Sequence, residues 1–386
     1  MDFAFSAEQE AIRATARRFA AQRLAPGYRL REAEGRIDKS LIREMGGLGL
    51  IGVDLPEKAG GLGLESVTAG VIIEEICRAD ISVGYVQLLG SLMGSIVAAN
   101  AGPEVQKDIV PRICSGEIVV ALGLTEPRGG SDAANLQLKA RRDGSSSYVL
   151  SGEKTSISMA EQSDYILVLA RTDETKPGAA GVSAFLTRLD AKGIGRSSID
   201  DVGSKAVGRG SVFFDDVRVD ARDLVGAEGG GFKQVMQGFD YSRALIGLQC
   251  LAPAFASLEE TWKYVTERVA FGNPLAKYQG VTEPLAEAET LLNAARLLCY
   301  KTLWLRDRGL PHTAEAAMCK WWAPKTAFET IHRCLLTHGH GGYSTDLPHQ
   351  QRLRDVMGLQ IGDGTEQIQK MIIAREKVGR VVVPYG

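Results

Sequence analysis

One glycine-rich segment has the residue types that an oxygen-rich ligand requires. It runs from residue 121 to residue 132 and reads Ala-Leu-Gly-Leu-Thr-Glu-Pro-Arg-Gly-Gly-Ser-Asp. Its glycines allow a ligand to approach the backbone closely, and the hydroxyls of Thr125 and Ser131 can donate hydrogen bonds to phosphate or carbonyl oxygens. A glycine-rich turn after a strand explains the same residues equally well. The spacing alone leaves both interpretations open.

A second candidate is a carboxylate near the C-terminus. Asp363 stands between Gly362 and Gly364, and the polar residues Thr365, Glu366 and Gln367 follow. A positioned carboxylate can act as a general base. An aspartate beside two glycines is also an ordinary turn residue. The elements around both segments, and the likeness of the whole chain to known sequences, must decide between these interpretations.

Composition limits the classes of function. The 386 residues suit two or three domains and can enclose a cofactor. With 45 basic and 47 acidic residues, the formal charge of -2 provides no overall field for nucleic acid or anionic lipid. The six cysteines include no C-x-x-C pair, which favours reduced, buried thiols. We therefore expect no metal site and no nucleic-acid partner.

The sequence offers no sign of a membrane protein. Residues 1–10 lack the basic and apolar regions of a signal peptide, and no uninterrupted apolar segment approaches the roughly 18 to 20 residues that cross a bilayer. We expect a cytoplasmic protein without membrane insertion.

The periodicity of apolar residues divides the chain into three parts. Helical spacing dominates residues 1–118, short β-branched runs separated by glycine, aspartate and serine fill residues 119–230, and long helical seams occupy residues 231–386. We predict an α+β multidomain protein with an N-terminal helical domain, a central β domain and a C-terminal helical bundle. The expected helices are residues 6–22, 40–48, 66–77, 83–101 and 103–115, and the expected strands are residues 118–122, 147–151, 165–171, 181–189 and 210–219. This order differs from the strand and helix alternation of a dinucleotide-binding parallel sheet, and no G-x-G-x-x-G follows a predicted strand.

The glycine-rich segment resembles the T-E-P-x-x-G-S-D motif of the acyl-CoA dehydrogenases, and the likeness extends over nearly the whole chain. Further matches in family order are residues 3–10, 55–64, 152–154, 230–243, 268–279, 339–343 and 362–375. The resemblance implies an N-terminal helical domain, a sandwich-like or barrel-like β domain and a C-terminal four-helix bundle, assembled as a homotetramer. It also implies FAD as the cofactor, an acyl-CoA substrate and electron-transfer flavoprotein as the electron acceptor.

The same resemblance assigns the residues that hold FAD. Arg268, Phe271 and Gln279 match residues that reach the FAD of a neighbouring subunit, and an arginine fork suits a pyrophosphate because charge-assisted paired hydrogen bonds are strong. The other implied FAD contacts are Leu122, Leu124, Thr125, Gly130, Ser131, Ser156, Ser158, Gly339, His340, Gly341, Thr365 and Gln367.

The resemblance also implies a reaction. A base removes the α-proton of the thioester while a β-hydride passes to flavin N5, which gives the 2-enoyl-CoA. Some members place the base before the arginine of a Phe-Asp-x-x-Arg segment, but here that position is Ser242, so we assign the base to Asp363. Its enclosed carboxylate should have a raised pKa. The implied substrate-binding residues are Ser131, Tyr241, Ser242, Arg243 and Gly364.

Asp363 replaces the glutamate that is usual in the family. The shorter side chain withdraws the carboxylate by about one C–C bond, and a misplacement near 1 Å can cost about 10²-fold in rate. We therefore expect an altered acyl group, with an alicyclic one of the cyclohexane-1-carboxyl-CoA type as the first hypothesis and a short branched one as the second. The floor of the acyl cavity is expected at residues 87–94.

Three further residues differ from the family pattern, and two other functions remain as alternatives. Ser156 replaces a tryptophan, Leu336 a glutamine and Arg128 a small residue, and the lost bulk at Ser156 leaves oxygen open as an acceptor. Relatives with an altered base perform elimination or desulfination without net oxidation. Nucleic-acid-associated relatives carry a basic extension, which this sequence lacks.

Overall fold

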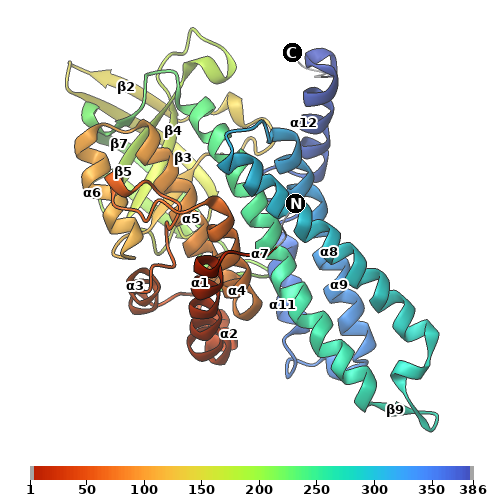
Figure 1. Ribbon diagram of the computed structural model, residues 1–386. Coiled ribbons are helices and arrows are strands. Elements are labelled where there is room, and N and C mark those ends of the chain that lie inside the picture. Colours follow the sequence, from red (N-terminus) through yellow and green to blue (C-terminus); the bar gives the residue numbers. More distant parts are fainter. Residues whose placement is uncertain (1–3, 383–386) are drawn as a thin grey trace.

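The computed structural model describes residues 4–382 and divides them into helices, strands and helices again (Figure 1). The N-terminal helices are α1 (Ala7–Phe19), α2 (Tyr28–Glu34), α3 (Lys39–Gly47), α4 (Ser66–Ala79), α5 (Ile81–Asn100) and α6 (Pro103–Cys114). A capping box starts α1: the Ser6 hydroxyl accepts from the Gln9 N–H at 3.1 Å, and the Gln9 side chain accepts from the Ser6 N–H at 3.0 Å. The helix that we expected over residues 6–22 therefore begins at its predicted cap.

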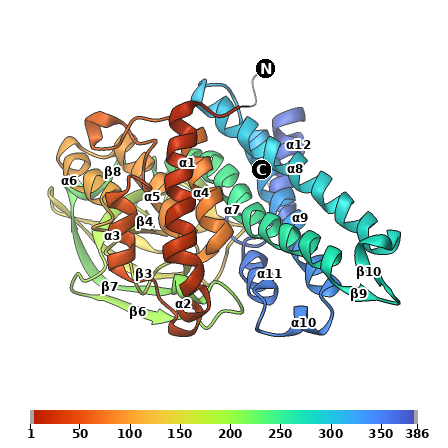
Figure 2. The same cartoon turned by 60° about the horizontal axis from the view of Figure 1, so that its bottom comes forward.

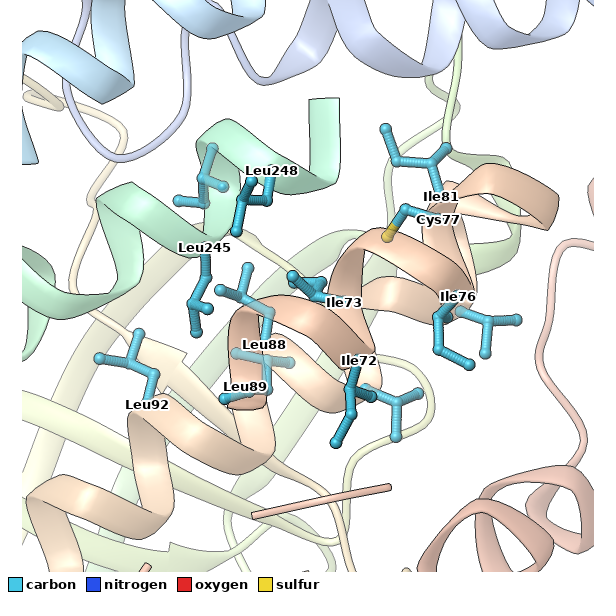
Figure 3. Packing of buried hydrophobic residues seen from close by; sticks show 14 of the residues in the cluster. Ile72, Ile73, Ile76, Cys77, Ile81, Leu88, Leu89, Leu92, Leu245 and Leu248 are labelled. Atoms are coloured by element: carbon cyan, nitrogen blue, oxygen red, sulfur yellow. The ribbon is translucent and has the colours of Figure 1, made fainter. Parts of the chain in front are cut away.

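Helix α5 lies at the centre of the molecule. Together with α4 it packs against the C-terminal helix α7 (Gly231–Glu267), and Figure 3 shows Ile73 and Leu88 facing Leu245 and Leu248 across this contact. Among residues 4–382, α5 is the one helix that is long and apolar enough in composition to cross a membrane, although Gln87, Ser91 and Ser95 interrupt it, so it contains no uninterrupted apolar segment of that length. However, 89% of its most apolar window is buried inside the structure, so its apolar character is explained by the core that it forms.

The central domain is one mixed sheet rather than two separate ones. Its strands follow the order β6-β7-β3-β2-β4-β5-β8, with β1 added parallel to β4. Its own apolar core includes Tyr148, Phe185 and Phe214, so the sheet curves around buried side chains. The strands are β1 (Val120–Gly123), β2 (Lys139–Asp143), β3 (Ser147–Ile157), β4 (Tyr165–Arg171), β5 (Val182–Arg188), β6 (Ile194–Ser198), β7 (Gly210–Asp220) and β8 (Leu224–Val225).

Strands β2 and β6 were not predicted. Their sequences, Lys-Ala-Arg-Arg-Asp and Ile-Gly-Arg-Ser-Ser, have few β-branched residues, and most of their side chains are exposed. They are held by backbone pairing, β2 with β3 and β6 with β7. Side-chain patterns report burial, so strands that bury little are missed.

The C-terminal part is helical, with a short hairpin at one end. Helices α7, α8, α9 and α12 pack together, as expected of a four-helix bundle, and Figures 1 and 2 show them on the opposite side of the molecule from the sheet. The further elements are β9 (Val269–Ala270), β10 (Asn273–Pro274), α8 (Gln279–Asp307), α9 (Thr313–Thr337), α10 (His340–Tyr343), α11 (His349–Gly358) and α12 (Glu366–Val378).

One buried carboxylate joins all three parts of the chain. Asp355 of α11 accepts from the hydroxyl of Tyr28 in α2 at 2.6 Å and from the backbone N–H of Ser204, which lies between β6 and β7. Asp355 is only 2% exposed, so water has little access to take its place as the acceptor of these two hydrogen bonds.

We expect Asp355→Ala to lower the free energy of unfolding by about 2–5 kcal/mol, because the buried Tyr28 hydroxyl and the half-buried Ser204 N–H would lose their acceptor. Urea unfolding followed by circular dichroism would measure the change. The control is Asp200→Ala, whose side chain is 92% exposed and which should stay within about 0.5 kcal/mol of the parent protein. Equal stability of the two variants would show that Asp355 does not hold the three parts together.

Candidate active site

Asp363 lies in the turn that connects α11 to α12. Its φ angle is 56° and that of Gly364 is 97°, so two consecutive residues occupy the left-handed region. Aspartate enters this region more readily than most residues, and glycine enters it without strain. The side chain of Gln369, in the first turns of α12, donates to the carbonyl oxygens of Asp363 at 3.0 Å and Gly364 at 3.2 Å. The turn is therefore held from the helix that follows it.

Two cations lie close to the Asp363 carboxylate without pairing with it. Burial raises the pKa of Asp363, and the positive charges of Lys320 in α9 and Arg243 in α7 oppose that rise. Among the described residues, neither cation comes within ion-pair distance of the carboxylate. The Asp363 residue as a whole is half-buried, so one side of it remains accessible. The carboxylate is thus compensated in charge while its oxygens stay available for a proton.

Arg243 is fixed by a neighbour on its own helix. Its guanidinium donates to Asp240 at 3.1 Å, and Asp240 also accepts from the hydroxyl of Thr313 in α9 at 2.7 Å. Ser242, at the alternative base position, is fully buried, and within residues 4–382 its hydroxyl has no hydrogen-bond partner. Because Ser242 has a hydroxyl and no carboxylate, Asp363 is the only carboxylate at either of the two positions where the family places its base.

Tyr241 belongs to a buried polar cluster next to this site. The Arg306 guanidinium of α8 lies 3.8 Å from the centre of the Tyr241 ring, and the tyrosine side chain faces Asp54 and Ser91. Ser91 of α5 donates to Asp54 at 2.8 Å, and Gln87 donates to Ser91 at 3.3 Å. Within the described chain, the Tyr241 hydroxyl, Asp54 Oδ2 and Gln87 Oε1 have no hydrogen-bond partner.

A buried ion pair supports the glycine-rich segment. Lys154 of β3 is fully buried, and its ammonium lies 2.8 Å from the Glu126 carboxylate and donates to the Leu124 carbonyl at 3.1 Å. Glu126 also accepts from the backbone N–H groups of Gln137 and Leu138 at 2.6 and 2.9 Å. Glu126 is thus a structural member of the motif, and sequence reasoning did not assign it this role.

The ligand-facing residues of this segment remain available. Thr125 and Ser158 are half-buried, Gly130 and Ser131 are exposed, and within residues 4–382 the three hydroxyls have no protein partner. Ser156 is also exposed; its φ is 57°, and its hydroxyl accepts from Arg209 at 3.1 Å. The pairing of β3 with β7 shifts register between Lys154 and Ile157, which frees this stretch from the regular ladder. Leu122 and Leu124 lie in and after β1. These free hydroxyls and exposed backbone groups fit a phosphate-bearing or carbonyl-bearing cofactor such as FAD.

A second group of predicted FAD residues lies at the far end of the C-terminal helical domain. Phe271, in the hairpin of β9 and β10, is 96% exposed with a φ of 50°, and the flanking residues Arg268, at the end of α7, and Gln279, at the start of α8, are exposed as well. Some 25 residues of α7 separate Arg268 from Arg243, which at 1.5 Å per residue is about 37 Å. Figure 1 shows β9 and α12 at opposite ends of the helical domain.

Gly339, His340 and Gly341 lie near that distant end as well. The preceding residue, His338, stacks on Tyr264 of α7 with ring centres 4.1 Å apart. Thr365 and Gln367, by contrast, begin α12 beside Asp363. Within one chain, Arg268 and its neighbours therefore lie far from the glycine-rich segment of the β domain and far from Asp363. Leu336 lies near Arg268 and is 62% exposed.

Lys320 is a residue that sequence reasoning missed. The available signal was a single charge in the apolar run of residues 316–323, where the sequence reads Ala-Ala-Met-Cys-Lys-Trp-Trp-Ala. A lysine that interrupts an apolar helical face is rarely buried without a function or a partner. Periodicity showed that α9 would be buried there, but not which group Lys320 would meet.

Comparison with known proteins gives three matching domain descriptions. They are "Acyl-CoA dehydrogenase, N-terminal domain" over residues 6–117, "Acyl-CoA dehydrogenase, middle domain" over residues 121–217 and "Acyl-CoA dehydrogenase, C-terminal domain" over residues 229–378. The predicted boundaries at 118/119 and 230/231 lie between helix α6 and strand β1 and between β8 and α7.

Curated relatives and solved structures match nearly the full chain. The mitochondrial short-chain specific acyl-CoA dehydrogenase of Mus musculus is 34% identical, over 94% of this chain and 88% of its own. Butyryl-CoA dehydrogenase of Megasphaera elsdenii has a TM-score of 0.94 and 31% identity, covering 98% and 100% of the two chains. A chain in a structure described as the electron transferring flavoprotein of Acidaminococcus fermentans has a TM-score of 0.95 and 31% identity, with the same coverage.

Proposed function

Because this chain belongs to the acyl-CoA dehydrogenase family, we propose that it oxidises a short and compact acyl-CoA thioester with Asp363 as the base. It is an oxidoreductase and a flavoprotein whose cofactor is FAD. The observation that carries the proposal is the Asp363 turn, where the residue is half-buried and two cations, Lys320 and Arg243, act on the carboxylate charge without forming an ion pair with it.

The residues of the turn account for the two tasks that removal of an α-proton requires. The Asp363 carboxylate accepts the proton, and its raised pKa makes it a stronger base once it is ionised. Among residues 4–382, the backbone N–H of Asp363 donates to no protein atom, so it is free to donate to the thioester carbonyl oxygen as charge develops there. When bound, FAD supplies the acceptor for the β-hydride. Thr125, Ser131 and Ser158 would hold it from the β domain.

The polar cluster around Tyr241 favours a short acyl group. If residues 87–94 form the floor of the acyl cavity, as in the family, three polar atoms without a hydrogen-bond partner in the described chain lie at or beside that floor: Gln87 Oε1, the Tyr241 hydroxyl and Asp54 Oδ2, which is 4.0 Å from the Arg306 guanidinium. A long hydrocarbon tail beside them would offer no hydrogen-bond partner, which costs free energy for each unsatisfied group. The short-chain and butyryl relatives support the same size range.

The short side chain of Asp363 favours a compact group of particular shape. The carboxylate lies about one C–C bond further back than that of a glutamate, so the α-carbon must approach it more closely. An alicyclic acyl group holds its α-carbon in a rigid ring and can be positioned as a unit. We therefore place an alicyclic acyl-CoA first and a short branched one second.

We also propose electron-transfer flavoprotein as the electron acceptor and a homotetramer as the assembly. The likeness to the Acidaminococcus fermentans structure supports the first proposal. The exposed Arg268 and Phe271, far from Asp363 in the same chain, support the second, because such residues can complete the FAD site of a neighbouring subunit.

The substrate class is tested by steady-state kinetics with cyclic, branched and linear acyl-CoA thioesters. We expect kcat/KM for cyclohexane-1-carboxyl-CoA or a short branched thioester to exceed that for a straight chain of eight carbons by at least about 10-fold, which corresponds to about 1.4 kcal/mol. Mixing substrate and protein without oxygen should bleach the flavin. A preference for long straight chains would refute the substrate proposal, and product formed with a persistently oxidised flavin would refute the dehydrogenation.

A further inference from the structure

Lys320 is a fully buried cation that has no carboxylate partner in the described part of the chain. It projects from α9, and its ammonium donates to the backbone carbonyl oxygens of Leu359 at 2.6 Å and Gly364 at 3.4 Å. Moving an ammonium group from water into a protein interior costs several kcal/mol unless other groups compensate it. Two carbonyl oxygens and a nearby carboxylate, that of Asp363, are what compensates it here.

The two carbonyl groups enclose the segment that contains Asp363. Leu359 is the residue at the C-terminal cap of α11, where helical carbonyl groups lack partners and the helix dipole attracts positive charge. Gly364 is the residue directly after Asp363. Lys320 therefore connects both ends of a six-residue segment from a third element, while Gln369 holds the same turn from α12. A turn with two left-handed residues needs such support to keep a single geometry.

Lys320 also has more influence on the Asp363 charge than Arg243 does. Burial raises the pKa of Asp363, and of the two cations that oppose this, Lys320 has the larger effect. Arg243 is already shared with Asp240 at 3.1 Å. Burial lowers the pKa of Lys320 to about 8, with the Asp363 charge acting against that change. The charged and titratable groups around this pair are Arg243, Asp240 and Cys250 of α7, Tyr85 of α5 and Arg375 of α12.

We propose that Lys320 is the positioning residue of the catalytic base: it fixes the Asp363 turn through the Leu359 and Gly364 carbonyls and keeps the Asp363 carboxylate ionised. The inference rests on the proposed function of Asp363 and deepens it. Lys320 does not touch the substrate on this view. It acts through the direction of the Asp363 backbone N–H and through the charge of its carboxylate.

Two variants of Lys320 separate the positional effect from the effect of charge. Lys320→Met removes both the donor and the charge, and we expect kcat to fall by about 10²-fold with a smaller change in KM. Lys320→Gln keeps a donor for the carbonyls and removes only the charge. Loss of the cation raises the pKa of Asp363, so in both variants the rise of kcat with pH should move upward by about 1–3 pH units.

Stability and matched controls complete the test. Because Lys320→Met leaves the Leu359 and Gly364 carbonyls without their donor, the thermal midpoint of the FAD-containing variant should be lower than that of the parent protein, and the shifted pH profile is what separates positioning of the base from a purely structural role. Lys263→Met, whose parent side chain is 76% exposed on α7, should change neither kcat nor the pH profile. If Lys320→Met does not fold, Lys320→Gln carries the test alone through its pH profile.

The outcomes distinguish this inference from the proposed function. A wild-type protein that oxidises acyl-CoA, together with Lys320 variants that keep the parental kcat and pH profile, would refute the inference and leave the function intact. Lower stability with an unchanged pH profile would also refute it, because a structural role alone would suffice. A wild-type protein that oxidises no acyl-CoA, or an active Asp363→Asn variant, would refute the assignment of the base itself.

Discussion

Replacing Asp363 by asparagine is expected to lower turnover of the best acyl-CoA substrate by about 10²- to 10⁴-fold, the usual contribution of a positioned base. The amide has nearly the same shape as the carboxylate but cannot accept the α-proton. The backbone of the turn, held by Gln369 and Lys320 through carbonyl groups, should keep its conformation. Steady-state kinetics with the flavin content of each preparation would measure the effect.

The Asp363→Asn variant should retain FAD, because none of the hydroxyls that would hold the cofactor in the β domain contacts Asp363. Asp346→Asn is a suitable control, since Asp346 is exposed and hydrogen-bonded locally to Ser344. It should leave turnover unchanged. Retained activity in Asp363→Asn would mean that another group removes the proton. Loss of FAD from the variant would instead mean that the turn supports cofactor binding.

Replacing Lys154 by methionine is expected to lower the free energy of unfolding by about 3–5 kcal/mol, because it leaves the buried Glu126 carboxylate without its cation. The loss should also reduce the affinity for FAD, since Lys154 holds the Leu124 carbonyl at the start of the glycine-rich segment. Urea unfolding and fluorescence titration with FAD would measure the two effects.

Lys139→Met is the matched control for this prediction. Its ammonium pairs with Glu174 at 2.9 Å, but both side chains are about 60% exposed, so its loss should cost less than about 1 kcal/mol. A double variant, Lys154→Met with Glu126→Gln, should recover part of the stability because no uncompensated charge remains. If the Lys154 variant were as stable as the Lys139 variant, the buried pair would not support the segment.

Local patterns were sufficient for most of the fold. The capping box at Ser6, the long apolar run of α5 and the β-branched runs of β4 and β5 each correspond to an element of the structure. These patterns work because they record which side of an element is buried, and burial dominates the free energy of folding. Strands β2 and β6 were not predicted because they bury few side chains. They are held by backbone hydrogen bonds, which almost any sequence can form.

Part of the candidate site could be predicted from the sequence for a different reason. The Thr125 and Asp363 segments each carry their chemistry within a few consecutive residues, so a linear sequence displays them. The sequence also showed that Ser242 could not replace the base. It did not show that Glu126 is buried beneath its own motif.

By itself, the sequence determined the family resemblance, the order of the domains and the identity of the single carboxylate at a family base position. Only the tertiary structure decided which charges meet. Lys320 reaches the Asp363 turn from a separate helix, and the hydrogen bond from Tyr28 to Asp355 joins residues 327 positions apart. The physical reason is that a buried charge must find its partners in space, and the cost of leaving it unpaired is imposed by the packed interior rather than by its neighbours along the chain.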